Sequence, residues 1–223
     1  MTGSHYSVEP WVTYLVDLRP TEDEILAKMS SHRRQYIRRA LRRGTGVEIA
    51  TDIGFADEYY GQLRDVFARQ GLTPAHDVNT IRHLIRCLQP SGQLLMLRVR
   101  GPDESSIASM LSVGRGETAV AWGAALLREH ADQHPMELLW WETMRRWRER
   151  GATCFDLNGR ADYGRGDYKA RYGGVAVATA RFFRSRYAGM RFGREAVRRS
   201  VRTRQAVLGR RDRRRLTALE RRD

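Results

Sequence analysis

Three strand-like segments follow one another in the middle of the chain, with only short turn-forming stretches between them. They cover residues 93–100, 106–114 and 118–127. Segments with regular periodicity flank this block, as helices at 21–42, 55–70, 77–88 and 135–150 and as strands at 46–51, 154–157 and 175–183. This order predicts an α/β fold in which helices flank a mixed central sheet.

The predicted helices begin and end at residues with suitable local chemistry. Thr21 and Glu24 form a capping-box pattern at the start of the first helix, and Gly44 follows its end. Pro135 suits the first turn of the helix that Gly151 closes. Capping and backbone freedom therefore support the boundaries that the periodicity indicates.

Positive charge is concentrated at the end of the chain. The net charge is +14, and residues 184–223 contain 15 arginines and 4 acidic residues, so the first 183 residues carry only +3. We therefore predict a near-neutral domain at 1–183 and a basic, partly helical tail at 184–223. Such a tail favours an anionic partner, namely RNA, phosphate groups or an anionic membrane surface. A solvated arginine-rich helix with no partner would have the same composition.

Metal-binding and disulfide-forming side chains are few. Cys87 and Cys154 have neither the spacing of a zinc site nor the number that a disulfide framework needs. His130 and His134 are four residues apart but lack an obvious third ligand, so no metal is expected. No apolar run reaches the roughly 18 residues of a membrane helix, and the N-terminus has no signal-peptide pattern. These features predict a reduced, cytoplasmic protein.

The most specific motif is the run FDLNGRADYGRGDYKARYGG, which covers residues 155–174. A strand containing Asp156 is followed by a glycine-containing turn, then by Tyr168-Lys169 and by Tyr172-Gly-Gly. The run resembles the Phe-Lys and Phe-Gly-Gly pattern in the second domain of Fem-type aminoacyl transferases, which belong to the GNAT superfamily. The element order also coincides with the GNAT fold. The resemblance spans roughly residues 11–184 and implies a GNAT-like domain that takes an aminoacyl group from tRNA.

The resemblance implies roles for two residues of this motif. Lys169 would stabilise the oxyanion or the leaving group of acyl transfer, a step that needs positive charge or hydrogen-bond donors. The backbone carbonyl of Tyr168 would accept the proton of the attacking amine. An ordinary surface lysine is the other interpretation of Lys169, but only Lys28 and Lys169 are lysines among the 40 basic residues.

Four further residues are predicted to bind substrate. Arg69 matches a family position implicated in holding the acceptor's phosphates, although the macrodipole alone favours a cation near a helix C-terminus. Trp122 precedes a glycine within a strand, as in the family, and would line the cleft or belong to the core. Arg38 lies in an arginine-rich helix suited to phosphate or RNA contact, or simply to solvation. Arg171 lies within the motif itself.

The junction between the strand at 118–127 and the helix at 135–150 bears on the acyl donor. GNAT enzymes that use acyl-CoA hold its pyrophosphate there on a glycine-rich backbone at a helix N-terminus. In this chain the junction has no glycine, contains Glu129 and Asp132, and ends at Pro135, which lacks an N–H group. Aminoacyl-tRNA is therefore the preferred donor, and an acyl-CoA-dependent N-acyltransferase is the alternative.

The acceptor is less constrained, because the chain has room for one GNAT-like domain whereas cell-wall Fem enzymes have two. We expect an amine acceptor, either a peptidoglycan precursor or a peptide of secondary metabolism such as antibiotic biosynthesis. A partner protein that supplies the missing half is another possibility. A non-catalytic module that binds RNA or a membrane is the remaining alternative.

Overall fold

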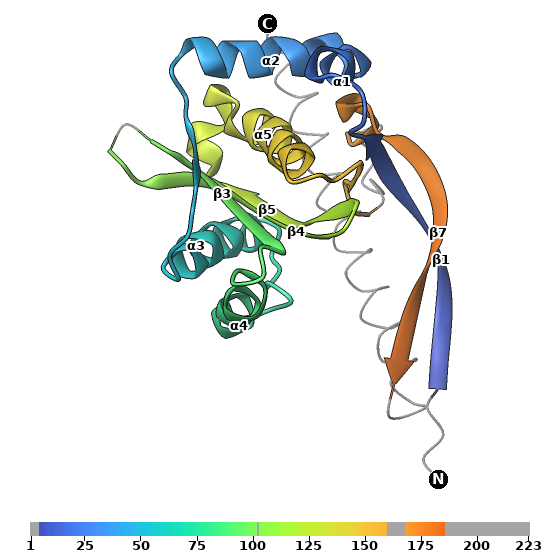
Figure 1. Cartoon of the computed structure of the whole chain (residues 1–223). Helices are drawn as coiled ribbons and strands as arrows, with labels where there is room; N and C mark the ends of the chain where they lie inside the picture. Colours follow the sequence, from blue (N-terminus) through green and yellow to red (C-terminus); the bar gives the residue numbers. More distant parts are fainter. Residues whose placement is uncertain (1–4, 102, 160–167, 186–223) are drawn as a thin grey trace, which may run out of the picture. The chain divides into compact units, whose positions relative to one another are not determined.

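The structure is a computed structural model that describes residues 5–101, 103–159 and 168–185 (Figure 1). The chain divides into two units, one formed by Trp11–Thr179 and the other by residues 1–10 and 180–223. Its elements are β1 (His5–Asp17), α1 (Glu22–Lys28), α2 (Ser31–Arg42), β2 (Val47–Ile49), α3 (Phe55–Ala68), α4 (Val78–Leu88), β3 (Leu94–Arg100), β4 (Ser106–Arg115), β5 (Thr118–Leu126), η1 (Arg128–Gln133), α5 (Pro135–Glu149), β6 (Cys154–Asp156), η2 (Ala170–Tyr172) and β7 (Val175–Ser185). Beyond β7, the predicted tail lies outside the described residues.

The strands form one sheet in the order β2-β3-β4-β5-β6-β1-β7. The strands from β2 to β5 pair antiparallel with their neighbours, as do β1 and β6, whereas β5 and β6 run parallel. The predicted α/β class with a mixed sheet is thus confirmed. Because α5 crosses over between β5 and β6, the carboxyl ends of these two strands lie at the same edge of the sheet.

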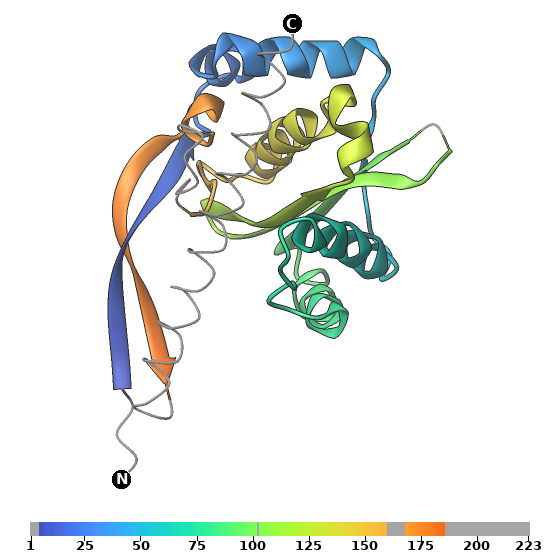
Figure 2. The same ribbon diagram turned by 180° about the vertical axis from the view of Figure 1, so that it is seen from behind.

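Helices cover both faces of the sheet. Helices α2 and α5 lie on one face and α3 and α4 on the other, as two opposite views show (Figures 1 and 2). Strand β3 is buried on both sides, with Leu95 and Leu97 in the core that includes α5, and Leu94 and Met96 in the core that includes α3 and α4. A strand covered on both faces is apolar along its length, which explains the continuous apolar run at 94–97.

The helix predicted over residues 21–42 is two helices in the structure. The capping box of Thr21 and Glu24 is present at the start of α1. The backbone is then extended at Met29 and Ser30, where Met29 is buried and the Ser30 hydroxyl accepts a hydrogen bond from the Arg33 N–H. Ser30 therefore caps a second helix, a signal that the continuous helical periodicity concealed.

Strand β1 is missing from the sequence-based prediction. Pro10 interrupts the segment, and proline is uncommon inside a strand except at an edge or a bulge. In the structure Tyr14 and Val16 are buried, and Leu15 pairs with Asp156 of β6. Pairing with a strand about 140 residues away along the chain, rather than local propensity, therefore decides this element.

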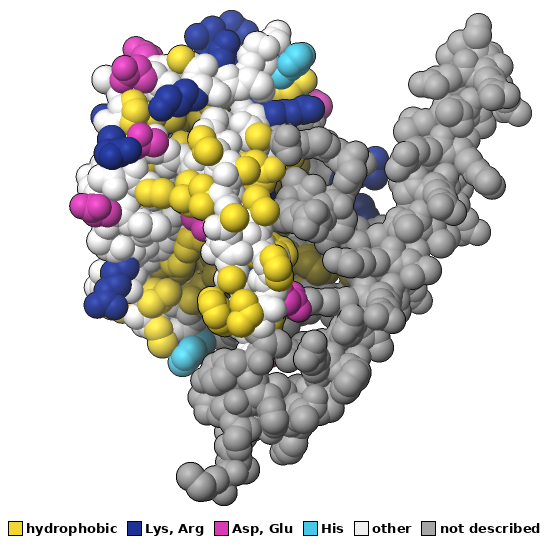
Figure 3. Space-filling view, turned by 90° about the vertical axis from the view of Figure 1, so that its right-hand side faces the viewer, with side chains coloured by type: hydrophobic (Ala, Val, Ile, Leu, Met, Phe, Trp, Pro, Cys, Tyr) yellow, Lys and Arg dark blue, Asp and Glu magenta, His cyan; other side chains and the backbone are white. Residues whose placement is uncertain are grey.

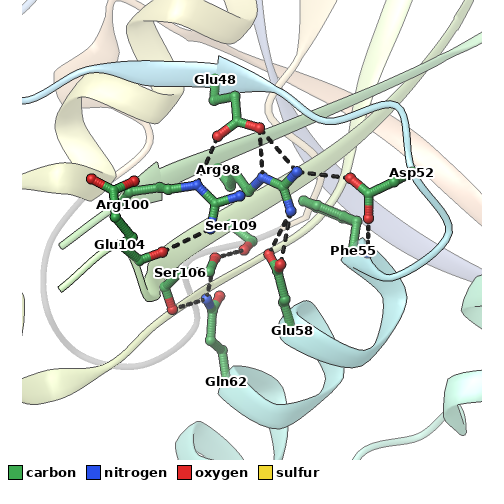
Figure 4. A network of polar contacts seen from close by, with 10 residues as sticks. All are labelled: Glu48, Asp52, Phe55, Glu58, Gln62, Arg98, Arg100, Glu104, Ser106 and Ser109. Atoms are coloured by element: carbon green, nitrogen blue, oxygen red, sulfur yellow. Dashed lines mark hydrogen bonds and ion pairs between the residues drawn. The ribbon is translucent and has the colours of Figure 1, made fainter.

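A buried arginine joins β2, β3 and the start of α3 (Figure 4). Arg98 is 5% exposed. Its guanidinium group contacts the carboxylates of Glu48, Asp52 and Glu58 at 2.9, 2.7 and 2.8 Å. Arg100 makes a further contact with Glu48 at 2.9 Å. A planar cation that binds several carboxylates fixes their relative directions, so this network anchors the start of α3 to the sheet.

Strand β7 carries exposed apolar side chains. Val175 is 67% exposed and Val177 is 37% exposed. Hydrophobic side chains are also frequent on the face of the described residues that Figure 3 shows. The start of β7 therefore adds little to the buried core of the Trp11–Thr179 unit.

Candidate functional site

Strands β5 and β6 separate at the edge of the sheet where both end. They pair over only three residues, from Thr118 opposite Cys154 to Val120 opposite Asp156, and β5 then continues to Leu126. Beyond the pairing, the Asn158 side-chain amide donates to the carbonyl of Ala121 at 2.9 Å. In open α/β sheets, ligands bind beyond the carboxyl ends of parallel strands. This separation is therefore the place to look for a site.

Lys169 lies at this place. Gly159, just past the end of β6, has a left-handed backbone with φ of 82°. A Cβ atom built on Gly159 would be 3.6 Å from the Lys169 Nζ atom and 3.3 Å from the indole of Trp11. The ammonium group thus lies against the backbone where the two strands part, and the indole of Trp11 borders the same glycine. Glycine at this position keeps the space open, because a side chain here would fill it.

Two tyrosines flank the lysine and face a buried arginine. Tyr168 and Tyr172 place their hydroxyl oxygens 3.1 Å apart. The guanidinium carbon of Arg33 lies 4.4 Å from the ring centroid of Tyr168 and 4.8 Å from that of Tyr172. Arg33 also forms an ion pair with Glu137 of α5. Burial raises the pKa of both phenols, so these hydroxyls stay protonated and serve as hydrogen-bonding groups.

The N-terminus of α5 packs against α2. His134 precedes the helix with a left-handed backbone, φ of 56°, and its ring stacks on Tyr36 with centroids 4.0 Å apart. Burial lowers the pKa of His134. The Arg43 side chain donates to the Asp132 carbonyl at 3.1 Å, and Glu137 places a carboxylate in the first turn. Glu137 thus brings a carboxylate to the first turn of α5, and no side chain of the described residues caps this helix.

Trp122 lies at a bulge in β5. Its neighbours Gly123 and Ala121 pair with consecutive residues of β4, so Trp122 is the extra residue. Its ring is half-buried and lies 6.3 Å from the ring of Tyr59 and 5.7 Å from that of His76. Bulges beside active sites redirect side chains, so the partial exposure of Trp122 leaves the predicted cleft role open.

The three predicted arginines have different surroundings. Arg69 forms an ion pair with Asp65 at 2.5 Å and donates to the Leu126 carbonyl at 3.4 Å. Arg171 is exposed, and its carbonyl accepts a hydrogen bond from the Ser30 N–H at 2.9 Å. Arg38 is exposed on α2, and within the described part of the chain it has no carboxylate partner. Their substrate roles remain predictions.

The structure also bears on metal binding and membrane insertion. Within residues 5–101, 103–159 and 168–185, no three His, Cys, Asp or Glu side chains converge as a metal site requires. In the same ranges, no helix is both long and apolar enough to cross a bilayer.

The family model described as "Acetyltransferase (GNAT) domain" matches residues 31–170, which is more than half of the chain. The chain belongs to this family. It is therefore an acyltransferase domain of the GNAT type. Curated proteins provide no sequence match.

Solved structures share the fold of this GNAT domain. FemX matches with a TM-score of 0.68 and 17% identity, over 74% of this chain and 59% of FemX. L-PGS from Bacillus licheniformis matches with a TM-score of 0.54 and 12% identity, over 92% of this chain and 68% of that chain. The chain thus spans less than two thirds of FemX. These likenesses confirm a Fem-like GNAT fold.

Several residues of this GNAT domain escaped the sequence-based prediction of the site. Arg33 lies four residues before the buried Ile37 and seven before the buried Ala40, so its place on the inward face of α2 was readable from periodicity. Its partner Glu137 is 104 residues away along the chain, and no local pattern connects the two. Trp11 of β1 and Lys169 both lie beside Gly159, and the pairing of β1 with β6 joins these segments from distant parts of the chain.

Proposed function

We propose that this GNAT domain transfers an aminoacyl group from aminoacyl-tRNA to an amine acceptor and so forms an amide bond. The observation that supports the choice of donor is the first turn of α5, which holds the Glu137 carboxylate and begins at Pro135. Acyl-CoA would need the backbone N–H groups there for its pyrophosphate. Instead, Glu137 adds a carboxylate paired with Arg33, and His134 stacks on Tyr36. A pyrophosphate would meet the Glu137 carboxylate, and Pro135 offers it no N–H group.

The proposed reaction uses Lys169 and the Tyr168 backbone. The acceptor amine attacks the ester carbonyl, a C–N bond forms, and the negative charge on the resulting oxyanion is stabilised by the Lys169 ammonium group. The Tyr168 carbonyl accepts a hydrogen bond from the amine as it loses its proton. The ester C–O bond then breaks, and the ribose hydroxyl of the tRNA leaves with that proton.

The outer face of α2 supports contact with RNA. Arg38, Arg39 and Arg42 are exposed, and none has a carboxylate partner among the described residues. Unpaired guanidinium groups on adjacent turns suit the phosphates of a nucleic-acid backbone. The arginine-rich segment 184–223 has the same chemistry in its composition. We propose that tRNA binds to α2, with the segment 184–223 adding contacts to RNA or to an anionic membrane surface.

The proposed acceptor is an amine of a peptidoglycan precursor or of a secondary-metabolite peptide in the cytoplasm. The chain spans 59% of FemX. A small peptide amine is the simplest acceptor of this kind, and a partner protein that contributes to the acceptor site is an alternative arrangement.

In the test, the purified protein is mixed with amine acceptors and with tRNA that carries radiolabelled amino acids. A parallel reaction replaces the charged tRNA by CoA thioesters. We expect label to pass from tRNA to an acceptor, and Lys169→Ala to lower the rate by about 10²–10³, the effect of removing one oxyanion-stabilising group. The matched control is Lys28→Ala, because Lys28 is the other lysine and is exposed. Its rate should equal that of the wild type.

Other outcomes would change the proposal. Transfer from a thioester but not from tRNA would establish an acyl-CoA-dependent N-acyltransferase, the alternative that the acetyltransferase description of the family favours. Equal rates in Lys169→Ala and the wild type would remove Lys169 from the reaction. No transfer from either donor, with RNA binding retained, would indicate a non-catalytic binding module.

A further inference from the structure

The turn that carries Lys169 is short and is held by backbone hydrogen bonds. Lys169 precedes η2, and its carbonyl accepts from the Tyr172 N–H at 3.1 Å. Gly173 closes the turn with φ of 81°. The Arg171 carbonyl accepts from the Ser30 N–H at the start of α2, at 2.9 Å. The turn is therefore attached to α2 by its backbone as well as by side chains.

Arg33 lies where α2, α5 and this turn meet. It is 8% exposed, and it is the one buried arginine of helix α2, all of whose residues are described. Its guanidinium group lies over the rings on either side of Lys169 and pairs with Glu137. The Tyr172 ring packs in turn against Trp140 of α5, at 5.6 Å between centroids.

The contacts of Arg33 are better suited to orienting the turn that carries Lys169 than to stabilising the fold. Well-packed apolar side chains of similar volume often stabilise a fold as well as a buried ion pair does. A guanidinium group, however, is planar, and it can lie over aromatic faces while donating to a carboxylate in a fixed direction. Such a group constrains Tyr168 and Tyr172 together, and Lys169 lies between them in the chain.

We propose that Arg33, held by Glu137, is a positioning residue that sets the orientation of the Tyr168–Tyr172 turn and thereby the place of the Lys169 ammonium group. Arg33 acts through this turn and does not touch the substrate. The inference rests on the proposed function for its effect on turnover. Its effect on the location of Lys169 can be measured without any substrate.

The first experiment is substrate-free and uses the fact that the chain has two lysines. A brief pulse of an acetylating N-hydroxysuccinimide ester labels amines, and peptide mass spectrometry gives the labelling of Lys169 relative to exposed Lys28. We expect the double variant Arg33→Met/Glu137→Gln to raise this ratio severalfold, because the turn is no longer held. The matched control Arg98→Met/Glu58→Gln removes the other buried arginine and one of its partners and should leave the ratio unchanged.

The second experiment measures turnover of aminoacyl-tRNA. Arg33→Lys keeps a cation beside Glu137 but loses the planar group over the rings. We expect its melting temperature to stay near that of the wild type, its kcat to fall about tenfold or more because misplacing a reacting group by about 1 Å is costly, and its KM for tRNA to stay unchanged. A purely structural role would not separate kcat from KM in this way.

The two experiments distinguish the two proposals. A labelling ratio that is the same in the wild type and the Arg33→Met/Glu137→Gln variant would overturn the positioning role, as would full kcat in Arg33→Lys. A raised ratio in a protein whose wild type transfers nothing from tRNA would support the positioning role and refute the proposed function. If the double variant does not fold, the kcat of Arg33→Lys and its ratio of Lys169 to Lys28 labelling test the positioning role instead.

Discussion

Among the described residues, two arginines are buried, and they differ in what surrounds them. Arg98 contacts three carboxylates whose side chains are between 31% and 52% exposed. Arg33 contacts one carboxylate, Glu137, whose side chain is 12% exposed, and two aromatic rings. The first arrangement leaves the anions within reach of water. The second encloses both charges.

The difference shows how a buried cation can serve two purposes. Around Arg98 the charge pairs connect β2, β3 and α3 (Figure 4). Around Arg33 the contacts converge on the turn beside Lys169. Removing either arginine should cost stability, but only the loss of Arg33 should alter the site.

The largest expected effect on stability is that of Arg33→Met. The substitution leaves Glu137 charged, buried and without its partner, which costs about 3 kcal/mol of the free energy of unfolding. Urea denaturation would measure it. The double variant Arg33→Met/Glu137→Gln should recover most of the loss, because no buried charge is left. Equal stability of the single and double variants would contradict the comparison.

Arg98→Met should cost less, about 1–2 kcal/mol, because water can solvate the carboxylates that lose their partner. The same denaturation series would test this value. Turnover per folded molecule should match that of the wild type. If Arg98→Met lost more unfolding free energy than Arg33→Met, the exposure of the partner carboxylates would not be what sets the loss of stability.

A matched pair of glycines, Gly159 and Gly151, tests whether the site lies at Gly159. Gly159 and Gly151 have φ angles of 82° and 89°, so alanine at either position should cost about 1–2 kcal/mol in backbone strain. A Cβ at Gly151 would meet nothing within 4 Å, whereas one at Gly159 would meet Lys169 and Trp11. We therefore expect Gly159→Ala alone to reduce turnover. Equal turnover in both variants would argue against a site at Gly159.

The smallest expected effect is on the pH dependence of stability. Burial lowers the pKa of His134 below its ordinary value of 6.5, so the fold favours the neutral ring and loses stability as the pH falls below 6.5. Hydrogen bonds from Arg100 and Arg98 lower the pKa of Glu48 below 4.5. The stability that the Glu48 carboxylate contributes is therefore lost as the pH falls below 4.5.

Urea unfolding at a series of pH values would separate the loss of stability below pH 6.5 from the loss below pH 4.5. His134→Asn should remove the loss just below pH 6.5, because asparagine also tolerates the left-handed backbone and has no proton to gain there. Glu48→Gln should leave that loss in place and weaken the one at lower pH. A loss below pH 6.5 that persists in His134→Asn would show that another group causes it.

Much of the fold follows from local patterns. The three central strands, the helices α3, α4 and α5 and the capping box at Thr21 are recognised because period, caps and turns are properties of neighbouring residues. The break between α1 and α2 and the strand β1 are not, because a buried Met29 and a pairing with β6 decide them. The Tyr168-Lys169 motif is recognisable because its chemistry lies within a few residues.

Local patterns in the sequence are enough to specify the α/β order and the place of the motif. They also specify the inward face of α2, because spacing along one helix puts Arg33 on the side of Ile37 and Ala40. Packing between distant segments is needed to bring Glu137 of α5 to Arg33 and the His134 ring to Tyr36. These contacts join segments about 100 residues apart in the chain. Their partners are chosen by how helices pack across the sheet, and no local spacing encodes that choice.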